Sequence, residues 1–389
     1  MKRIIFNLLL NLLFMPFTAS LLMAQDSVTV SGLGASIKGQ LSAWGHYNPL
    51  NTMQIQTAKR YILQLNSHIK LGKERMFDIE GSANLNSMMD IRTFDSVSFD
   101  WNVTPYRLWA RYSTKQSEVR VGLQKINFGS ATLLRPLMWF DQLDPRDPQQ
   151  LTNGVWGLLG RYYFLNNTNI WLWGLYGNKE QRPWEIGTTY RKIPEIGGRL
   201  QVPVFKGEAA ITYHYRQADM TFFSTAPSFT KDIPENRFGF DAKFDMEVGL
   251  WCEASWISKS KNVGVLTNQQ LINIGTDYTF GIGNGLNAVL EHLIFSSDET
   301  AFNFGNTFNF SAISVNYPLS IDDHINIISF FDWNNKTIYN FANWKHQFGK
   351  IETHIMLYFN PDKYHLPQQG NTGIQFAGKG IQIMLLYKH

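Results

Sequence analysis

The segment GEAAITYHYR, Gly207–Arg216, alternates apolar and polar side chains with a period of two. One face of such a segment carries Ala209, Ile211, Tyr213 and Tyr215. The opposite face carries Glu208, Thr212, His214 and Arg216. A period of two is the period of a β-strand, so the segment predicts a strand with one apolar and one polar face.

The same alternation continues on both sides of this segment. Arg237–Asp245 repeats it downstream, Arg60–Leu71 shows it upstream, and Ile351–Asn360 shows it near the C-terminus. The pattern predicts an all-β protein. In a water-soluble sandwich the apolar faces point into the core, whereas in a barrel embedded in lipid they point outward.

Residues 1–24 are typical of a secretory signal peptide. Lys2 and Arg3 precede an apolar run, Ile4–Leu22, and a small-residue cleavage site at Ala24. The competing interpretation is a membrane anchor, because the run is close to the roughly 20 residues that span a bilayer. Polar residues inside the run, such as Asn11, favour the signal peptide. We therefore expect an exported domain over residues 25–389.

The composition of this domain favours an outer-membrane barrel. The chain is 14% aromatic and 17% charged, and Cys252 is its single cysteine, so no internal disulfide can form. After the N-terminal run, no stretch approaches the 18 uninterrupted apolar residues of a membrane-spanning helix. An exported, aromatic-rich chain of this kind matches a transmembrane β-barrel. The net charge of +4 is too small to indicate a nucleic-acid partner.

Loop lengths predict the number of strands. Short turns alternate with longer connections, as in outer-membrane barrels with short periplasmic turns and long extracellular loops. The longer connections are expected at Asn48–Gln56, Asn86–Val97, Gly129–Asn153, Gly177–Lys192, Gln217–Glu235, Lys259–Asn268, Ser296–Ala301, Asn334–Lys336 and Pro361–Thr372. This spacing predicts a transmembrane antiparallel up-and-down β-barrel of about 18 strands, with 16 as the alternative and Ile186–Arg191 as a further candidate strand.

The third long connection, Gly129–Asn153, is too long and too apolar to extend into water as a turn. In a closed barrel we expect it to fold into the lumen and form the constriction. The candidate constriction residues are Arg135, Asp141, Asp144, Arg146 and Asp147. A simpler interpretation is that the Asp-Pro pairs only shape turns. Three acids at this spacing also leave a calcium site open, although no calcium-loop motif is present.

The strand VRVGLQKINFG, Val119–Gly129, and the stretch LLRPLMWFDQLDPRD, Leu133–Asp147, together resemble porin-like outer-membrane proteins of Gram-negative bacteria. The resemblance is strongest to the porin-like barrels of Bacteroidetes and covers the strand and third-loop region. It implies a passive diffusion channel in the outer membrane, with its third extracellular loop folded inward. It does not identify the solute.

The polar faces of the middle strands are rich in arginine. The predicted pore-lining residues are Arg107, Arg111, Arg120, Arg161, Arg199 and Arg216. Later strands place more acids on the same face, so we expect near-neutral or weakly anion-favouring permeation. Trp44 and Trp109 are expected on the inner face, where they could stack on a sugar ring. Trp171 and Trp173 are expected in an aromatic girdle at the membrane interface.

No motif indicates a catalytic, metal or cofactor site. The histidines show no metal-ligand spacing, and no GxSxG nucleophile elbow is present. The main hypothesis is a porin for small hydrophilic solutes or ions, embedded in outer-membrane lipid. The alternative is a barrel with a structural or assembly role in an envelope or secretion complex. We expect no enzymatic activity, although an outer-membrane hydrolase with Ser and His on adjacent strands stays an alternative. A homotrimer is compatible with a barrel of this size, but no sequence feature fixes the oligomeric state.

Overall fold

The structure is a computed structural model that describes residues 29–30, 33–49, 53–92, 96–221, 231–362 and 376–389. The predicted signal peptide, residues 1–24, lies outside this described part. Among the described residues, no helix is long and apolar enough to cross a membrane.

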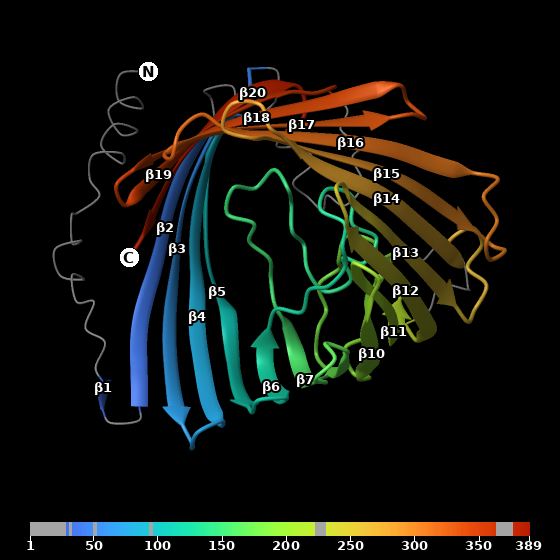
Figure 1. Cartoon of the computed structure of the whole chain (residues 1–389). Helices are drawn as coiled ribbons and strands as arrows, with labels where there is room; N and C mark the ends of the chain where they lie inside the picture. The colour runs from blue at the N-terminus through green and yellow to red at the C-terminus, as the bar shows by residue number, and fades with distance from the viewer. Residues whose placement is uncertain (1–28, 31–32, 50–52, 93–95, 222–230, 363–375) are drawn as a thin grey trace.

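The regular elements of the described residues are antiparallel strands (Figure 1). In the first half of the chain they are β1 (Thr29–Val30), β2 (Leu33–Tyr47), β3 (Met53–Lys70), β4 (Met76–Arg92), β5 (Ser96–Ser113), β6 (Ser117–Gln124), β7 (Val155–Tyr163), β8 (Asn169–Leu175), β9 (Thr188–Thr189) and β10 (Glu195–Val204). In the second half they are β11 (Gly207–Asp219), β12 (Ile233–Asp245), β13 (Gly249–Lys259), β14 (Asn268–Phe280), β15 (Leu286–Asp298), β16 (Thr307–Pro318), β17 (Asp323–Asp332), β18 (Thr337–Phe348), β19 (Ile351–Phe359) and β20 (Lys379–Lys388).

Eighteen of these strands close into one barrel, as the loop lengths predicted. Each strand pairs with the next along the chain, β8 pairs with β10, and β20 pairs with β2 to complete the ring. The two exceptions are β1, a two-residue strand on β2, and β9, a two-residue strand on β11. The candidate strand at Ile186–Arg191 is thus only the two-residue β9, which is not one of the strands that close the barrel.

The apolar faces point outward and the polar faces point into the lumen. On β11, Ile211 is 60% exposed, whereas His214 and Arg216 are fully buried. On β12, Phe238 and Phe240 face outward in the same way and Arg237 is buried. This orientation is the reverse of a soluble sandwich, and it matches a barrel whose outer face meets lipid.

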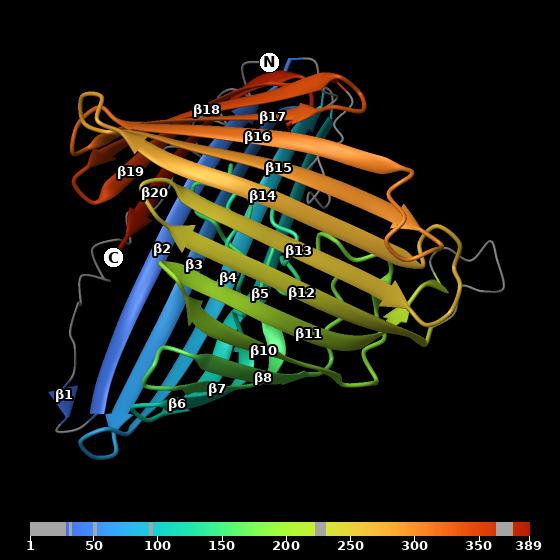
Figure 2. The same cartoon turned by 45° about the vertical axis from the view of Figure 1, so that its right-hand side comes forward.

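The barrel wall is uneven in height (Figures 1 and 2). β3 and β5 contain 18 residues each and β4 contains 17, whereas β6, β7 and β8 contain only 8, 9 and 7. The prediction of a long connection at Asn86–Val97 is therefore wrong, because the two flanking strands continue to Arg92 and from Ser96. Apolar alternation through Phe99 and Trp101 extends β5 beyond β6, while β4 stays paired with β5 as far as Ser96.

The strand expected over Val119–Gly129 is too long at its end, because β6 stops at Gln124. From there the chain leaves the wall as loop L3, residues 125–154, and returns at Val155 to begin β7. In Figure 1 this teal and green loop lies inside the barrel, between the blue strands β2–β5 and the olive strands opposite them. The inward path of L3 positions the candidate site.

Candidate functional site: the loop-lined lumen

Loop L3 is held across the lumen by a carboxylate on β15. Glu291 is fully buried, and its two oxygens accept hydrogen bonds from the backbone N–H groups of Thr132, Leu133 and Leu134 at 2.6 to 3.2 Å. The Thr132 hydroxyl donates to the same carboxylate at 3.0 Å. Hydrogen bonds to a charged acceptor are stronger than neutral ones, so Glu291 is a principal anchor of the loop.

A second carboxylate, Glu253 on β13, holds the same part of L3. It accepts hydrogen bonds from the backbone N–H of Ala131 at 2.9 Å and of Leu137 at 2.5 Å. Gly129 has φ of +100°, and a Cβ there would lie only 2.5 Å from the Glu253 carboxylate. Glycine is required here for both reasons, since it tolerates positive φ and leaves room for the carboxylate.

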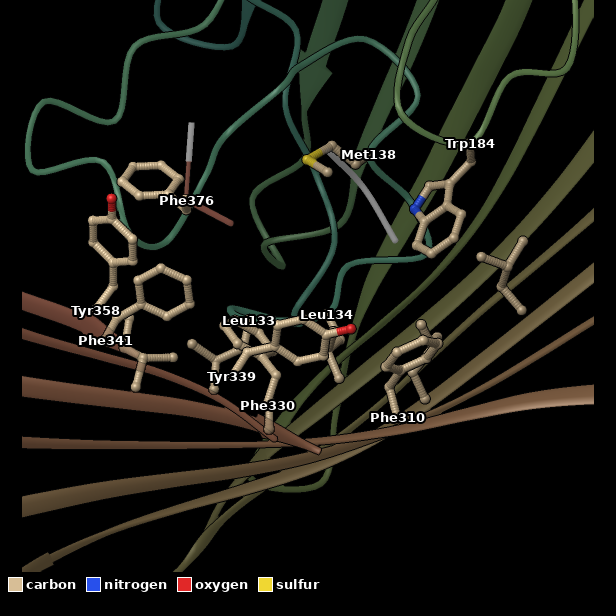
Figure 3. Packing of buried hydrophobic residues seen from close by; sticks show 14 of the residues in the cluster. Leu133, Leu134, Met138, Trp184, Phe310, Phe330, Tyr339, Phe341, Tyr358 and Phe376 are labelled. Carbon is tan, nitrogen blue, oxygen red and sulfur yellow. The ribbon is translucent and has the colours of Figure 1, made fainter. Parts of the chain in front are cut away.

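Apolar side chains complete the attachment of L3 (Figure 3). Leu133, Leu134 and Met138 are each 5% exposed or less and pack in one cluster with inward residues of the far wall. These wall residues include Leu271, Leu293, Phe310, Phe330, Tyr339 and Phe341. The prediction that L3 packs against the inside of the barrel is confirmed, and the far wall carries a matching apolar patch.

A second loop, which the sequence did not reveal as an inward one, also enters the lumen. Loop L4, residues 176–194, joins β8 to β10. The Trp184 indole N–H donates to the backbone carbonyl of Arg135 in L3 at 2.8 Å, and its ring stacks on Phe295 of β15. L4 therefore braces L3. The only sign in the sequence that L4 packs inward was the large apolar Trp184 in a connection made mostly of polar residues.

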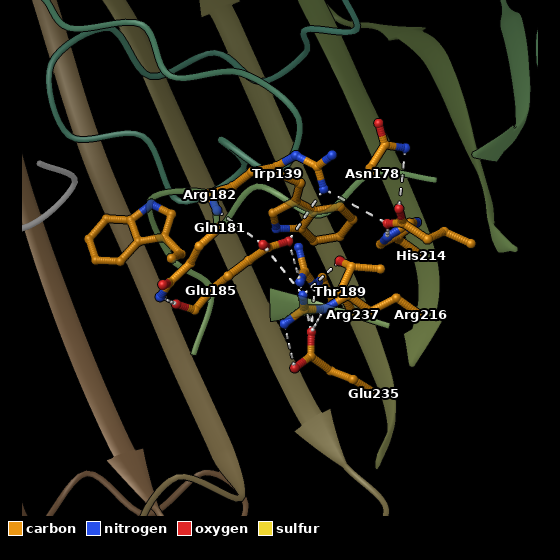
Figure 4. Close-up of polar contacts among 12 residues, drawn as sticks. Trp139, Asn178, Gln181, Arg182, Glu185, Thr189, His214, Arg216, Glu235 and Arg237 are labelled. Atoms are coloured by element: carbon orange, nitrogen blue, oxygen red, sulfur yellow. Dashed lines mark hydrogen bonds and ion pairs between the residues drawn. The ribbon is translucent and has the colours of Figure 1, made fainter. Parts of the chain in front are cut away.

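L4 is fixed by a buried cluster of charges (Figure 4). Glu185 lies 2.9 Å from the Arg237 guanidinium and 3.4 Å from that of Arg216. Glu235 forms a 2.6 Å ion pair with Arg216 and a 3.3 Å ion pair with Lys259. Burial raises the pKa of the Glu185 carboxyl, but the surrounding arginines outweigh it and leave the pKa below its ordinary value. Glu185 therefore stays ionised and paired.

Two of the predicted pore-lining arginines lie within enclosed polar networks. Arg216 is fully buried in the cluster around Glu185. Arg199 is 4% exposed and forms a bidentate pair with Asp241, at 2.5 and 2.9 Å. Both side chains face inward, as the alternation predicted, but L3 and L4 cover that part of the wall. In this structure Arg199 and Arg216 serve as partners in buried ion pairs and do not line an open pore.

The other four predicted arginines lie on the less covered side of the lumen, on β5, β6 and β7. Arg111, Arg120 and Arg161 surround one carboxylate, Glu118, at 3.5, 3.7 and 3.0 Å. Their side chains stay 25%, 15% and 16% exposed. Arg107 donates to the carbonyl of Thr152 in L3 at 2.9 Å, so it also supports the return of the loop.

Aromatic rings hold these guanidinium groups. Arg120 lies over the Trp109 ring at 4.6 Å from its centroid, and Arg161 lies over Trp171 at 3.8 Å. The inward position of Trp109 is confirmed. The girdle assignment of Trp171 and Trp173 is wrong, because Trp173 is 4% exposed and packs against Phe128 inside the barrel. Trp171 lies directly opposite the inward Arg161 on the β7–β8 pair, and residues opposite each other point to the same face of a sheet. Trp173, two residues further along β8, therefore also points inward.

The charged residues of L3 are mostly paired within the loop. Arg135 and Asp141 form a buried ion pair at 3.1 Å, and Arg146 pairs with Asp144 at 2.5 Å. Asp147 accepts hydrogen bonds from the backbone N–H of Gln149 and Leu151. The turn-shaping interpretation of these acids is thus supported beside the constriction interpretation. In the part of the chain that the structure describes, no cluster of three acid, histidine or cysteine side chains could hold a metal ion.

Burial changes the acidity of two L3 carboxyls. It raises the pKa of Asp141 above its ordinary value, although Arg135 opposes the shift. Burial also raises the pKa of Asp147, opposed by two backbone hydrogen bonds and assisted by the nearby charge of Asp144. Of these two carboxyls, Asp147 is the one that lines the cavities described next.

Two cavities meet at residues 146–148 of L3, which are called the tip of the loop below. The upper cavity, of about 790 Å³, lies toward the long loops and is bounded by L3, L4, β2–β5, β19 and β20. The lower cavity, of about 300 Å³, lies toward the short turns between β16, β17, β18 and β19. Both are lined by Arg146, Asp147, Pro148 and Met356. The sequence identified the two charged residues of this tip. It did not identify Met356 or, on the wall of the upper cavity, Arg60.

A closed 18-stranded barrel with a polar interior and an inward third loop is the architecture of outer-membrane porins. Comparison with solved structures agrees with this class. OccAB1 of Acinetobacter baumannii has a TM-score of 0.57 at 9% identity, and the match covers 94% of this chain and 98% of OccAB1.

Two further solved structures show the same fold. OpdQ of Pseudomonas aeruginosa has a TM-score of 0.53 at 9% identity, with 92% of this chain and 99% of OpdQ covered. OmpT of Vibrio cholerae, an outer membrane protein solved in a trimer form, has a TM-score of 0.50 at 9% identity, with 92% and 100% covered. At these identities the similarity shows the fold alone. No protein-family model and no curated protein matches the sequence.

Proposed function

We propose that this protein is an outer-membrane porin through which small hydrophilic solutes and ions diffuse passively. The observation that carries the proposal is the pair of cavities on the two sides of the L3 tip, lined largely by polar and charged side chains inside a closed barrel. A solute that passes from the upper to the lower cavity has to pass Asp147, Arg146 and Met356. The tip is therefore the proposed constriction.

We further propose that permeation is near-neutral or weakly anion-favouring. The less covered wall contains Arg107, Arg111, Arg120 and Arg161, and the acids among them are Asp78, Glu80 and Glu118. Arginine stays protonated at any physiological pH, so the group retains a small excess of positive charge. This excess supports a weak preference for anions at low ionic strength, where charges are little screened.

The experiment that tests the channel is ion conductance of the purified protein in a planar bilayer. We expect stepwise conductance increments that are symmetric in voltage. Absence of conductance in a correctly folded barrel would contradict the porin proposal and favour a structural or assembly role. Hydrolysis of lipid or peptide substrates by the same preparation would indicate an enzyme instead.

The same proposal includes outer-membrane location, export through a signal peptide over residues 1–24, and membership of the porin-like family of the Bacteroidetes type. The fold supports the location, and the stretches Val119–Gly129 and Leu133–Asp147 support the family. N-terminal sequencing of the protein from isolated outer membranes should begin at Gln25. An intact Met1 would show that the segment is an anchor.

We also propose a homotrimer, supported by an exposed apolar patch on β5. Phe99 and Trp101 face outward and are 67% and 69% exposed. From Ser96 to Arg107, β5 pairs with β4 on one edge, but no described strand pairs with its other edge, the one that faces β6 lower down. At roughly 3.3 Å per residue and a tilt of about 40°, Trp101 lies about 30 Å above the turn at Ser113, beyond an apolar band of about 25 Å. A neighbouring copy in the same membrane would cover the patch.

Trp101→Glu tests the trimer. Cross-linking of the wild-type protein in the membrane should give a three-copy species, and the variant should lose it while its barrel stays folded. Phe308→Glu is the matched control on another exposed outward ring. A wild-type protein that cross-links as a single copy would contradict the proposal.

A further inference from the structure

We propose that the upper cavity is a binding site for uncharged saccharides. The inference deepens the porin proposal, on which it rests, because it names the class of solute that enters the channel. Trp44 of β2, Arg60 of β3 and Asn84 of β4 form one wall of the cavity, and L3 and L4 form the opposite wall. Its volume of about 790 Å³ lies within the usual range of small-molecule sites.

Six primary amides and six charged side chains make up most of the polar lining of this cavity. The lining amides are Asn84, Gln142, Gln149, Asn153, Gln181 and Gln382. Each amide presents an acceptor oxygen and a donor NH₂ in one plane. Sugar hydroxyls both donate and accept, so a hydroxyl-rich ligand matches this lining better than a ligand that only donates or only accepts.

Some of these polar atoms are buried without a protein partner. Among the described residues, the side-chain oxygen of Asn84, the side-chain nitrogen of Gln149 and the Nε of Arg60 have no hydrogen-bond partner. One is an acceptor and two are donors. Because the surrounding protein encloses these three atoms, a solute in the cavity meets the other polar atoms of the lining instead.

The charges of the lining balance. The acids are Asp144, Asp147 and Glu180, and the bases are Arg60, Arg146 and Arg182. Arg146 pairs with Asp144 at 2.5 Å, and Arg182 pairs with Glu185 at 3.5 Å. Arg60 interacts electrostatically with Asp147. Because no sign predominates, the cavity has little reason to prefer an anion or a cation over a neutral solute.

Aromatic rings supply the apolar surface on which the C–H groups of a sugar ring can pack. Trp44, Tyr106 and Phe376 line the cavity. The Arg60 guanidinium lies over the Trp44 ring at 5.1 Å and donates to the Gln149 side-chain oxygen at 3.1 Å. Arg60 therefore fixes both an aromatic wall and an amide of L3.

The test is calorimetric titration of the purified, detergent-solubilised protein with maltotriose, and with trigalacturonate as an anionic trisaccharide of similar size. We expect saturable binding of maltotriose and weaker binding of trigalacturonate. Trp44→Leu should raise the Kd for maltotriose at least tenfold, and Asn84→Leu should raise it severalfold. Asn326→Leu, in the lower cavity, is the matched control and should leave the Kd unchanged.

Conductance of the same preparations separates the two proposals. Wild-type channels should show a maltotriose-dependent current block that Trp44→Leu weakens. Channels that conduct ions without binding maltotriose, or that bind trigalacturonate more tightly, would overturn the saccharide inference and leave the porin proposal intact. Equal weakening by Asn326→Leu would also overturn it. A protein that binds maltotriose in calorimetry but never conducts would overturn the porin proposal alone.

Discussion

Both halves of the inner wall carry inward arginines, but the two sets differ in how far the inner loops bury them. On the half formed by β10–β13, Arg199, Arg216 and Arg237 are at most 4% exposed, because L3 and L4 cover them. On the half formed by β5–β7, Arg111 and Arg161 stay 25% and 16% exposed. The arginines form ion pairs in both halves, but only in the β5–β7 half do ion-paired arginines stay partly exposed to the lumen.

The loops create this difference, since the strands alone do not. Both halves have the period-two pattern and inward charges. In the covered half, the Glu253 carboxylate accepts hydrogen bonds from backbone N–H groups of L3, so the loop supplies partners to the wall. In the open half, Arg111, Arg120 and Arg161 pair with side chains of the wall, and only Arg107 among the four bonds to L3. Removing or loosening L3 should therefore reduce the difference in exposure between the arginines of the two halves.

Deletion of Leu133–Gln149 should give the largest effect. The segment contributes no strand, and its removal exposes the far wall to the lumen, so single-channel conductance should rise severalfold while the barrel still assembles. Planar-bilayer recording measures the conductance, and the heat-modifiable mobility of folded barrels in electrophoresis controls for assembly. An assembled variant with unchanged conductance would show that L3 does not restrict the path.

Replacement of the anchor Glu291 by Ala should loosen L3 without removing it. The loop loses several charge-assisted hydrogen bonds at Thr132 to Leu134, so the free energy of unfolding should fall by about 2–3 kcal/mol. Current noise should increase as the loop fluctuates. Denaturant titration measures the first effect. The matched control is Glu208→Ala, an exposed acid on β11, which should change neither quantity by much.

Replacing Arg107, Arg111 and Arg120 together by Gln should alter ion selectivity. The reversal potential in a salt gradient should move toward cation preference, most visibly near 0.01 M salt, where the Debye length is about 30 Å. Arg199→Gln is the control in the covered half and should leave the reversal potential as it was. A triple variant with the parental value at low salt would reduce these arginines to partners of Asp78 and Glu118.

Acidification should produce the smallest effect, through Asp147. Because its pKa is raised by burial, the carboxyl takes up a proton above the ordinary range for aspartate. Protonation removes a negative charge beside Arg60, so anion preference should increase as pH falls through that pKa. The native state also binds this proton more tightly than the unfolded chain, which adds stability on the acidic side. Asp147→Asn should abolish this part of the pH dependence of the reversal potential.

The period-two alternation predicted the strands and the outward apolar face, and the loop lengths predicted the strand number. The apolar run Leu133–Phe140 was sufficient to predict that L3 packs inside. The path of L3 was not predictable, because Glu253 and Glu291 look like any other inward acids until their backbone partners are known. L4 was missed for a related reason, since Trp184 and Glu185 are inward only because distant strands supply their partners.

The central claim is that solutes pass the L3 tip between the upper and the lower cavity. Cysteine accessibility in single channels tests it most directly, in a Cys252→Ser background. Asn84, on β4, lines the upper cavity, whereas Ser255 lies behind Trp139 in the covered half. We predict that a charged, water-soluble thiol reagent reduces the current through Asn84→Cys channels and leaves Ser255→Cys channels unchanged. Modification of Ser255→Cys with no effect at Asn84→Cys would contradict the claim.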